Sequence, residues 1–397
     1  MQYRKLKAVK IFDGSAWLND KQIVIANDSG VICDIASEAE AGDGIEHLDG
    51  ILIPGFVNCH CHLELSHLKN LVPTHTGLVN FLLTVIKQRT APQEQEEIQE
   101  HIRSAEKEMS DNGIVAVADV CNTNHGVDVK RKSSLYFHNL IEVINLHDNN
   151  LQKQLSHFNL VLDQHSILDQ KKACNVLSPH APYSVSRATS QALNIASANA
   201  IISIHNQETA AENEIFQEGQ GDFLTLYNAL GIVGLPLNTS GKTSFQTWLP
   251  YFTLGQTILI VHNTFISEED ILFGKIHSKR YGLNLIYCLC PNANLYIENK
   301  LPPVALLIKH DCTIVLGTDS YGSNGQLSIA AEIKTLRTSF PWLSLDTILK
   351  WSCKNGAEAL AQSALGTIKK GKKPGLVLLE TDLVNKEHVA GVSNRIL

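Results

Sequence analysis

The chain lacks the features that mark a partner of nucleic acid or of a membrane. Its formal net charge is -7 over 397 residues, and its one dense group of Lys residues lies at 369–373. No strong basic field is therefore available to attract a polyanion or anionic lipid. No apolar run approaches the roughly 18 residues that span a bilayer. We expect neither a nucleic-acid partner nor a membrane partner.

Signals of export and of a disulfide framework are also missing. Residues 1–12 are basic, but no apolar segment and no small-residue cleavage site of a secretory signal follow them. The nine cysteines are an odd number without framework spacing, which is typical of free thiols in a reducing compartment. The pairs Cys59/Cys61 and Cys288/Cys290 lack Cys-x-x-Cys spacing, so we interpret them as small buried residues. We expect a cytoplasmic protein.

The composition is that of an ordinary globular protein. Apolar residues make up 44% of the chain and charged residues 18%, and there are only 12 prolines. The length exceeds that of a usual single domain, but a barrel of alternating strands and helices takes about 250 residues as one unit. One large domain and a small companion therefore fit the length.

A repeated pattern of apolar run and helical segment fills the centre of the chain. Eight runs read as strands buried on both faces: 52–60, 113–120, 134–144, 173–180, 200–205, 257–262, 283–290 and 312–319. Residues 92–110 between the first two are rich in helix formers. An open doubly wound sheet is the alternative. Such a sheet typically has a Gly-rich phosphate loop after its first strand, and this sequence has none there. We predict an α/β fold, a (β/α)8 TIM-type barrel.

Both ends of the chain have a different texture. Residues 3–12, 22–28 and 31–37 read as short strands, and no helical period precedes residue 60. Near the other end, a basic, turn-rich stretch leads into an apolar strand within 366–380. Because termini often lie close together, we predict one small β unit built from both. The expected domains are residues 1–53 and 363–397 for this unit and 54–362 for the barrel.

Polar residues end the strands of the predicted barrel. His60 and His62 lie on the same face of one strand, because successive side chains of a strand point to opposite faces. Other runs end in His180, His205, His262 and Asp319. The carboxyl ends of parallel barrel strands meet at one mouth, where active sites of this fold are built. A single histidine at a strand end is usually structural, but this set predicts one metal site.

Such a site has a definite chemistry. Three neutral imidazoles and one carboxylate around a divalent ion leave a net charge of +1, which lowers the pKa of a bound water towards about 7. We expect one divalent metal ion, Zn²⁺, with Fe²⁺ as the alternative because imidazole and carboxylate serve both. Glu208 follows His205 by three residues, just beyond the strand. It is either a solvated loop residue or a proton shuttle between water and substrate.

Six motifs carry a resemblance to a known family. They occur in the order PGFVNCHCH, LSPHAPY, IHNQET, IVHNTF, CPNAN and LGTDSYGSN. They resemble the barrel-strand motifs of the amidohydrolase superfamily, in its aminohydrolase branch. That branch contains deaminases of cytosine, guanine, adenosylhomocysteine and aminofutalosine, and the triazine chlorohydrolases. The resemblance covers nearly the whole chain and implies that the terminal β unit is a β-sandwich. The segment LELSH after His62 is most similar to aminofutalosine deaminases.

The resemblance also implies roles for single residues. The implied metal ligands are His60, His62, His205 and Asp319. Glu208 would protonate a ring nitrogen of the substrate, and Asp319 would accept a proton from the attacking water. His262 would lie beside the nucleophile, and His180 would contact the substrate. Binuclear relatives carry a carboxylated lysine after the fourth strand; residues 175–183 contain no lysine, which favours one metal.

The expected reaction is hydrolytic deamination of an amino-substituted heterocycle or nucleoside, with aminofutalosine as one model. Two alternatives stay open: hydrolysis of a cyclic amide or of a triazine-type carbon–chlorine bond at the same metal, and a barrel that serves only as a scaffold. Specificity is expected in the loops 63–90 and 208–249. Glu64 and His67 in the first loop either contact the substrate or only fix the loop. The aromatic residues of the second loop either stack on a heterocycle or pack helices: Phe216, Phe223, Tyr227, Phe245 and Trp248. Analogy alone suggests a homodimer.

Overall fold

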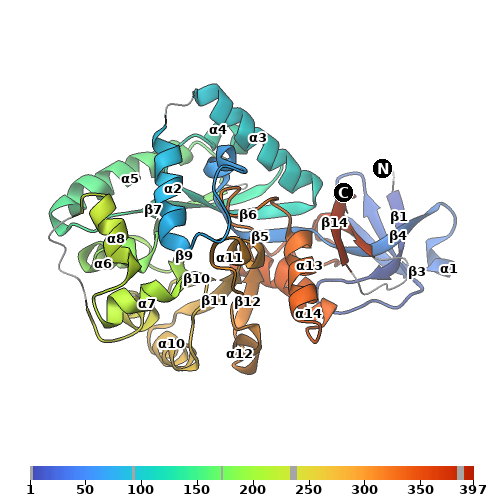
Figure 1. Ribbon diagram of the computed structural model, residues 1–397. Coiled ribbons are helices and arrows are strands. Elements are labelled where there is room, and N and C mark those ends of the chain that lie inside the picture. Colours follow the sequence, from blue (N-terminus) through green and yellow to red (C-terminus); the bar gives the residue numbers. More distant parts are fainter. Residues whose placement is uncertain (1–2, 92–93, 171–172, 233–238, 382–388) are drawn as a thin grey trace.

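Eight parallel strands form the wall of a barrel (Figure 1). The computed structural model describes residues 3–91, 94–170, 173–232, 239–381 and 389–397. The barrel strands are β5 (Phe56–Cys61), β6 (Ile114–Cys121), β7 (Tyr136–Val143), β8 (Ala173–Pro179), β9 (Ile201–Asn206), β10 (Thr257–His262), β11 (Asn284–Leu289) and β12 (Thr313–Leu316). Each overlaps one of the eight predicted runs, so the predicted (β/α)8 barrel is confirmed.

Hydrogen bonds close the strands into a ring. Strands β5 to β8 and β9 to β12 each pair in chain order as a parallel sheet. At one seam the His205 N–H donates to the carbonyl of His180, over 2.9 Å. At the other, the N–H groups of Thr318 and Asp319 both donate to the carbonyl of His60, each over 3.0 Å. A Cβ atom on Gly317 would lie 2.7 Å from that of His60, so only glycine permits this close approach.

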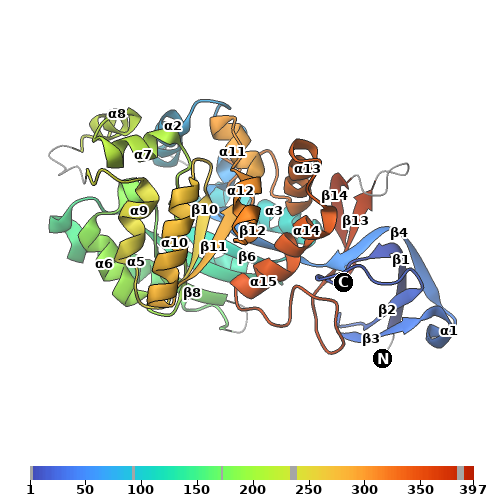
Figure 2. The ribbon, with the colours of Figure 1, turned by 90° about the horizontal axis from the view of Figure 1, so that it is seen from below.

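Helices cover the outside of the strands (Figures 1 and 2). They are α2 (Leu78–Thr90), α3 (Gln95–Asp111), α4 (Val127–Lys132), α5 (Leu151–His165), α6 (Arg187–Ala196), α7 (Ala210–Gln217), α8 (Asp222–Ala229), α9 (Ser244–Trp248), α10 (Glu268–Tyr281), α11 (Pro291–Glu298), α12 (Val304–Lys309), α13 (Ile329–Ser339), α14 (Leu345–Lys350) and α15 (Gly356–Ala359). The predicted helix at 92–110 is α3; residues 92–93 lie outside the described part of the chain. Every residue of β6 is buried, because both faces of the strand are covered. This burial explains why the strand is mostly apolar.

A mixed sheet joins the two ends of the chain. Its strands are β1 (Tyr3–Ile11), β2 (Gln22–Asn27), β3 (Ile32–Ser37), β4 (Ile45–Pro54), β13 (Leu376–Thr381) and β14 (Val389–Arg395). Strand β4 pairs parallel with β1 and antiparallel with β13, which brings both ends to the same side of the molecule (Figures 1 and 2). The described strands thus form one six-stranded mixed sheet from both ends of the chain, which confirms the predicted terminal β unit. The domain boundaries at 53/54 and 362/363 stay a prediction.

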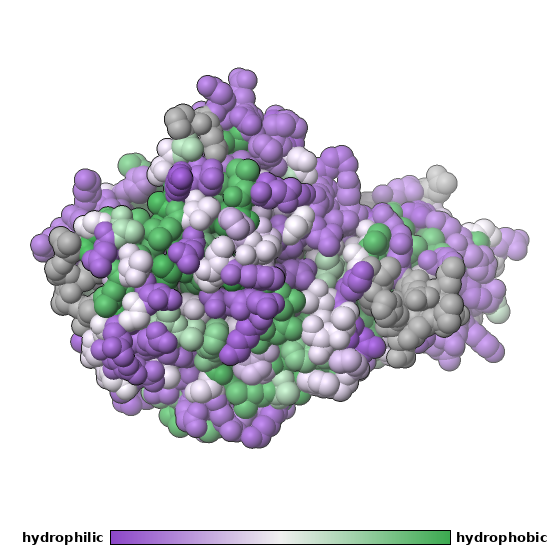
Figure 3. Space-filling view, viewed as in Figure 1, coloured by the Kyte–Doolittle hydropathy of each residue, from purple (hydrophilic) through white to green (hydrophobic). Residues whose placement is uncertain are grey.

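Two further features concern the outside of the molecule. The short helix α1 (Glu38–Ala41) lies before residue 60, where no helix was expected; four residues are too few to show a period. Helix α3 buries Ile102, Ala105 and Met109 and turns its charged residues outward, where Figure 3 shows a hydrophilic tip. No helix among the described residues combines the length and the apolar character needed to cross a bilayer.

Candidate metal centre

Three histidines converge at the carboxyl ends of β5 and β9. The ligand atoms of His60, His62 and His205 all lie within 4.8 Å of one another, and all three residues are buried. The Nε2 atoms of His62 and His205 are 3.2 Å apart. His205 is 143 residues from His62 in the sequence, yet the structure brings the predicted trio together.

Asp319 completes the group from the end of β12. Its Oδ1 lies 3.6 Å from Nε2 of His60 and 3.5 Å from Nε2 of His62. Its Oδ2 accepts a hydrogen bond from Ser323 Oγ over 2.6 Å. One carboxylate oxygen therefore faces the imidazoles, while the other is held by the protein.

The donor set fits one divalent cation. Both ring nitrogens of His60 are buried without a hydrogen-bond partner, which is costly unless another group satisfies them. Burial lowers the pKa of His205 to about 4 and the pKa of His62 well below its usual value, so both rings are neutral, as metal ligands must be. His205 Nδ1 donates to the carbonyl of His180 over 2.8 Å, which leaves Nε2 free for a metal. This chemistry suits zinc and iron alike.

The backbone is strained where the strands end at this centre. His262, Asp319 and Gln207 have φ values of 73°, 58° and 46°, in the left-handed region that residues other than glycine rarely adopt. Such outliers cost of order 1–3 kcal/mol each and cluster at functional sites. Here they lie on or next to residues that face the cluster.

Glu208 is buried beside the histidines, in a position suited to a proton donor. Its Oε1 lies 3.5 Å from Nε2 of His262, and its backbone N–H donates to Glu212 over 3.4 Å. Burial raises the pKa of Glu208 well above its usual range, and the charges of Asp319 and Glu212 raise it further. A raised pKa favours the protonated carboxyl, the form that a proton donor needs. Sequence reasoning missed Glu212, a fully buried residue whose pKa burial raises to about 7.

His180 and Glu142 lie on the other side of His205. The His180 ring is 4.9 Å from the His205 ring, and its Nδ1 lies 2.5 Å from Ser184 Oγ. Glu142, on β7, places a buried Oε1 without a hydrogen-bond partner 3.7 Å from His205 Nδ1. These three residues form a second group with metal-ligand spacing, but His205 Nδ1 is engaged with a carbonyl, so only two ligands would remain. The geometry favours one metal. Glu142 was not predicted, although it lies near the end of the apolar run at 134–144.

Glu64 lies in the 3₁₀ helix η1 (Leu63–Leu68) and holds a neighbouring loop. Its Oε2 accepts hydrogen bonds from the backbone N–H groups of Asn122 and Thr123, over 3.1 and 3.0 Å. Its Oε1 accepts from Arg89 over 3.1 Å. These contacts favour the loop-fixing alternative, and substrate contact by Glu64 stays a prediction. His67 is partly buried, and its role stays open.

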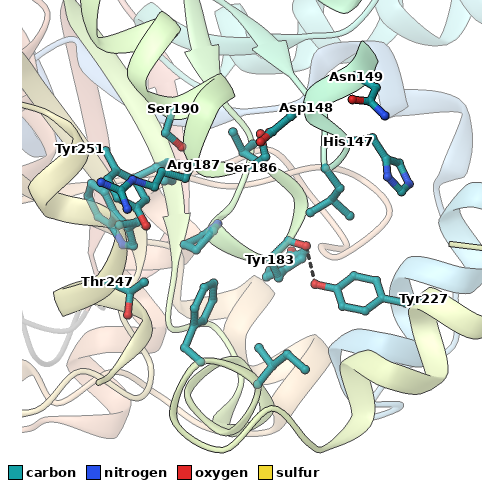
Figure 4. Close-up of a pocket in the computed structure, with 17 residues that line it drawn as sticks. His147, Asp148, Asn149, Tyr183, Ser186, Arg187, Ser190, Tyr227, Thr247 and Tyr251 are labelled. Carbon is teal, nitrogen blue, oxygen red and sulfur yellow. Dashed lines mark hydrogen bonds between the residues drawn. The ribbon is translucent and has the colours of Figure 1, made fainter. Parts of the chain in front are cut away.

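A cavity of about 460 Å³ is lined by Ile204, the residue before His205. Phe216, Tyr227, Trp248 and Tyr183 line it, and the Tyr183 ring is 5.7 Å from that of His180. Figure 4 shows the hydrogen bond from the Tyr227 hydroxyl to the Tyr183 carbonyl, which is 2.6 Å long. None of the predicted site residues lines this cavity. The aromatic residues of the second loop are buried and pack against one another or line this cavity.

Comparisons with known proteins agree with this geometry. The model of the Amidohydrolase family matches residues 51–396. A 5'-deoxyadenosine deaminase from Methanococcus vannielii is 25% identical over 354 residues, which cover 85% of this chain and 77% of the relative. A 5-methylthioadenosine/S-adenosylhomocysteine deaminase from Dictyoglomus turgidum is 24% identical over 96% of this chain and 85% of its own. The crystal structure of Helicobacter pylori aminofutalosine deaminase with methylthio-coformycin superposes with a TM-score of 0.80 at 22% identity, covering 99% of this chain and all of that chain.

Proposed function

Because this chain belongs to the amidohydrolase family and is a metal-dependent aminohydrolase acting on carbon–nitrogen bonds, we propose that it deaminates a purine nucleoside. The proposed substrates are nucleosides of the 5'-deoxyadenosine, methylthioadenosine or aminofutalosine type, on which the similar proteins act by name. The observation that supports the proposal is the position of Glu208, a buried acid whose pKa burial raises, in the same site as the cluster of His60, His62 and His205.

The proposed ligands of one divalent ion, with Zn²⁺ as first choice, are His60, His62, His205 and Asp319. Such an ion supplies Lewis acidity, which lowers the pKa of a coordinated water towards about 7. Fe²⁺ remains the alternative. Asp319 Oδ1, which faces His60 and His62, is the acceptor for a proton of the attacking water.

The chain's own groups then handle the remaining protons. The Glu208 carboxyl donates its proton to the ring nitrogen next to the carbon that carries the amino group, which makes that carbon electrophilic. Water attacks this carbon and gives one proton to Asp319, which passes it to the amino group. Ammonia then leaves, and the remaining hydroxyl proton returns to Glu208 as the carbonyl forms. His262 lies beside Glu208, and His180 on the opposite side of His205 is the proposed substrate contact. General acid–base catalysis of this kind is typically worth 10² to 10⁴ in rate.

Measurement of ammonia release tests this function. Zinc-loaded protein, with its metal content verified, would be offered 5'-deoxyadenosine, methylthioadenosine, adenosylhomocysteine, aminofutalosine, guanine and cytosine. We expect ammonia from at least one of the 5'-modified adenine nucleosides, at a rate above that with either free base. Absence of ammonia from all the nucleosides would overturn the proposal. Turnover of a cyclic amide or a chlorotriazine without ammonia would instead support the alternative hydrolases, and a protein that retains no metal would support the scaffold.

A further inference from the structure

Asn294 is a fully buried residue of α11 whose side chain faces the loop after β10. Its Nδ2 donates a hydrogen bond to Thr264 Oγ1 over 2.9 Å and lies 3.3 Å from His262 Nδ1. Its Oδ1 is buried without a hydrogen-bond partner. Asn294 belongs to the motif CPNAN, for which neither the metal centre nor the proton transfers above have a use.

The orientation of this amide follows from what each end meets. If the two ends were exchanged, the carbonyl would face Thr264 and His262, and the amide NH₂ would occupy the place without partners. A buried NH₂ would then leave two N–H groups unpaired, whereas the observed orientation leaves only one carbonyl oxygen unpaired. Buried N–H groups without partners are the rarer and costlier case. The amide N–H therefore faces His262 Nδ1.

A donor at Nδ1 decides which nitrogen of the His262 ring carries hydrogen. A neutral imidazole has one N–H and one acceptor nitrogen. If one nitrogen accepts a hydrogen bond, the other must therefore carry the hydrogen. We propose that Asn294 is a positioning residue that holds His262 with its hydrogen on Nε2, so that His262 donates a hydrogen bond into the site instead of accepting a proton from it.

The surroundings of Nε2 agree with that assignment. Oε1 of Glu208 lies 3.5 Å away, within reach of a donated hydrogen bond after a small movement of either side chain. When Oε1 accepts from His262, the acidic proton of Glu208 belongs on Oε2, where it is free to go to a substrate. The catalytic consequence rests on the proposed function, whereas the position of the ring hydrogen does not.

The position of the ring hydrogen is measurable without any substrate. Long-range ¹H–¹⁵N correlation spectra of histidine-labelled protein distinguish the two neutral forms, and the His262→Gln variant identifies the signal of His262. We expect hydrogen on Nε2 and a bare Nδ1 in the otherwise unaltered protein. Hydrogen on Nδ1 of His262 would overturn the inference. This measurement stands even if no nucleoside proves to be a substrate, so its failure is distinct from failure of the proposed function.

The variant Asn294→Asp reverses the donor. A carboxylate only accepts hydrogen bonds, so at a pH at which the introduced side chain is ionised, His262 must carry its hydrogen on Nδ1 and present a bare Nε2 to Glu208. We expect the spectrum to switch, bound metal to stay at one ion per chain, KM to change less than about threefold and kcat to fall roughly 10² to 10⁴-fold, as when another catalytic histidine is held in the wrong form. Asn299→Asp is the matched control, because it makes the same change at an exposed position that ends the same helix. An Asn294→Asp protein with an unswitched spectrum, or with the turnover of the control, would contradict the proposal.

Discussion

Two buried clusters of ionisable groups in this barrel differ in how many of their polar atoms have a partner within the protein. On the outer face of β6, Lys130 Nζ lies 2.5 Å from Asp119 Oδ2 and donates to Asn139 over 2.6 Å. The second oxygen of Asp119 accepts from the N–H of Leu63 over 2.8 Å. Although burial alone would lower the pKa of Lys130, the charge of Asp119 raises it above the usual value, so the pair stays ionised.

The histidine cluster at the barrel mouth is just as deeply buried but incomplete. His60 and Glu142 keep ring and carboxylate atoms that no protein group satisfies. Buried charges with a structural role therefore differ from those with a functional role. The groups around Lys130 and Asp119 satisfy one another, whereas the histidine cluster has atoms that a ligand could satisfy.

Replacement of His205 by Gln should have the largest effect on function. It removes one metal ligand, so we expect loss of bound metal and a fall in kcat/KM on the order of 10⁴-fold or more. The melting temperature of metal-free protein should change by only a few degrees, because no partner is left unpaired except the carbonyl of His180. Elemental analysis and steady-state kinetics check this. A variant with full metal content and wild-type turnover would exclude His205 as a ligand.

Replacement of Glu208 by Gln should separate proton transfer from metal binding. The variant keeps the size of the side chain and all four proposed ligands, so the metal content should equal that of the wild type. The fall in kcat should be 10² to 10⁴-fold, roughly 3 to 5 kcal/mol of barrier, because the amide has no acidic proton. Kinetics at verified metal content test this, and unchanged turnover would refute the role of Glu208.

Lys130→Met should lower the stability of the protein but leave metal binding and catalysis unchanged. Removal of one partner leaves Asp119 charged and buried, which typically costs 3 to 5 kcal/mol of stability. We expect that loss in denaturant unfolding, with metal content and kcat of the folded protein retained. The double variant Lys130→Met/Asp119→Asn should recover most of the stability, because Asn still accepts the N–H of Leu63. Equal destabilisation of the single and double variants would show that lost packing, rather than an unpaired charge, is the cause.

The smallest effect concerns Glu332, a third buried acid that is fully hydrogen-bonded. Its oxygens accept from Asn292 and Asn324, yet burial raises its pKa to about 8, against 4.5 in the unfolded chain. Between these values the folded state holds a proton that the unfolded state releases, so the free energy of unfolding falls as pH rises. In Glu332→Gln, the fall between pH 5 and 8 should be smaller by about 1 to 3 kcal/mol. Urea titrations at several pH values measure it, and identical slopes would contradict it.

The sequence allowed the strands and the metal-facing residues to be predicted for a common physical reason. A strand buried on both faces must be apolar, so a polar residue at its end stands out, as His60, His205 and Asp319 do. Glu142, Glu212 and Asn294 were not predicted, because their importance comes from contacts with other strands and helices that no spacing along the chain encodes. The β unit built from both chain ends was predicted, whereas the pairing order of its strands was not, because pairing between distant segments depends on tertiary structure.

The seam at His60 ties metal binding to the topology of the whole barrel. The carbonyl of His60 receives the N–H groups of Thr318 and Asp319, and Gly317 lets the first and last barrel strands approach this closely. Two of the proposed ligands therefore become neighbours only when the ring is shut. A cation held by these residues would bind the closed barrel far more tightly than a partly assembled chain, so its binding would stabilise the contact between the first and last barrel strands.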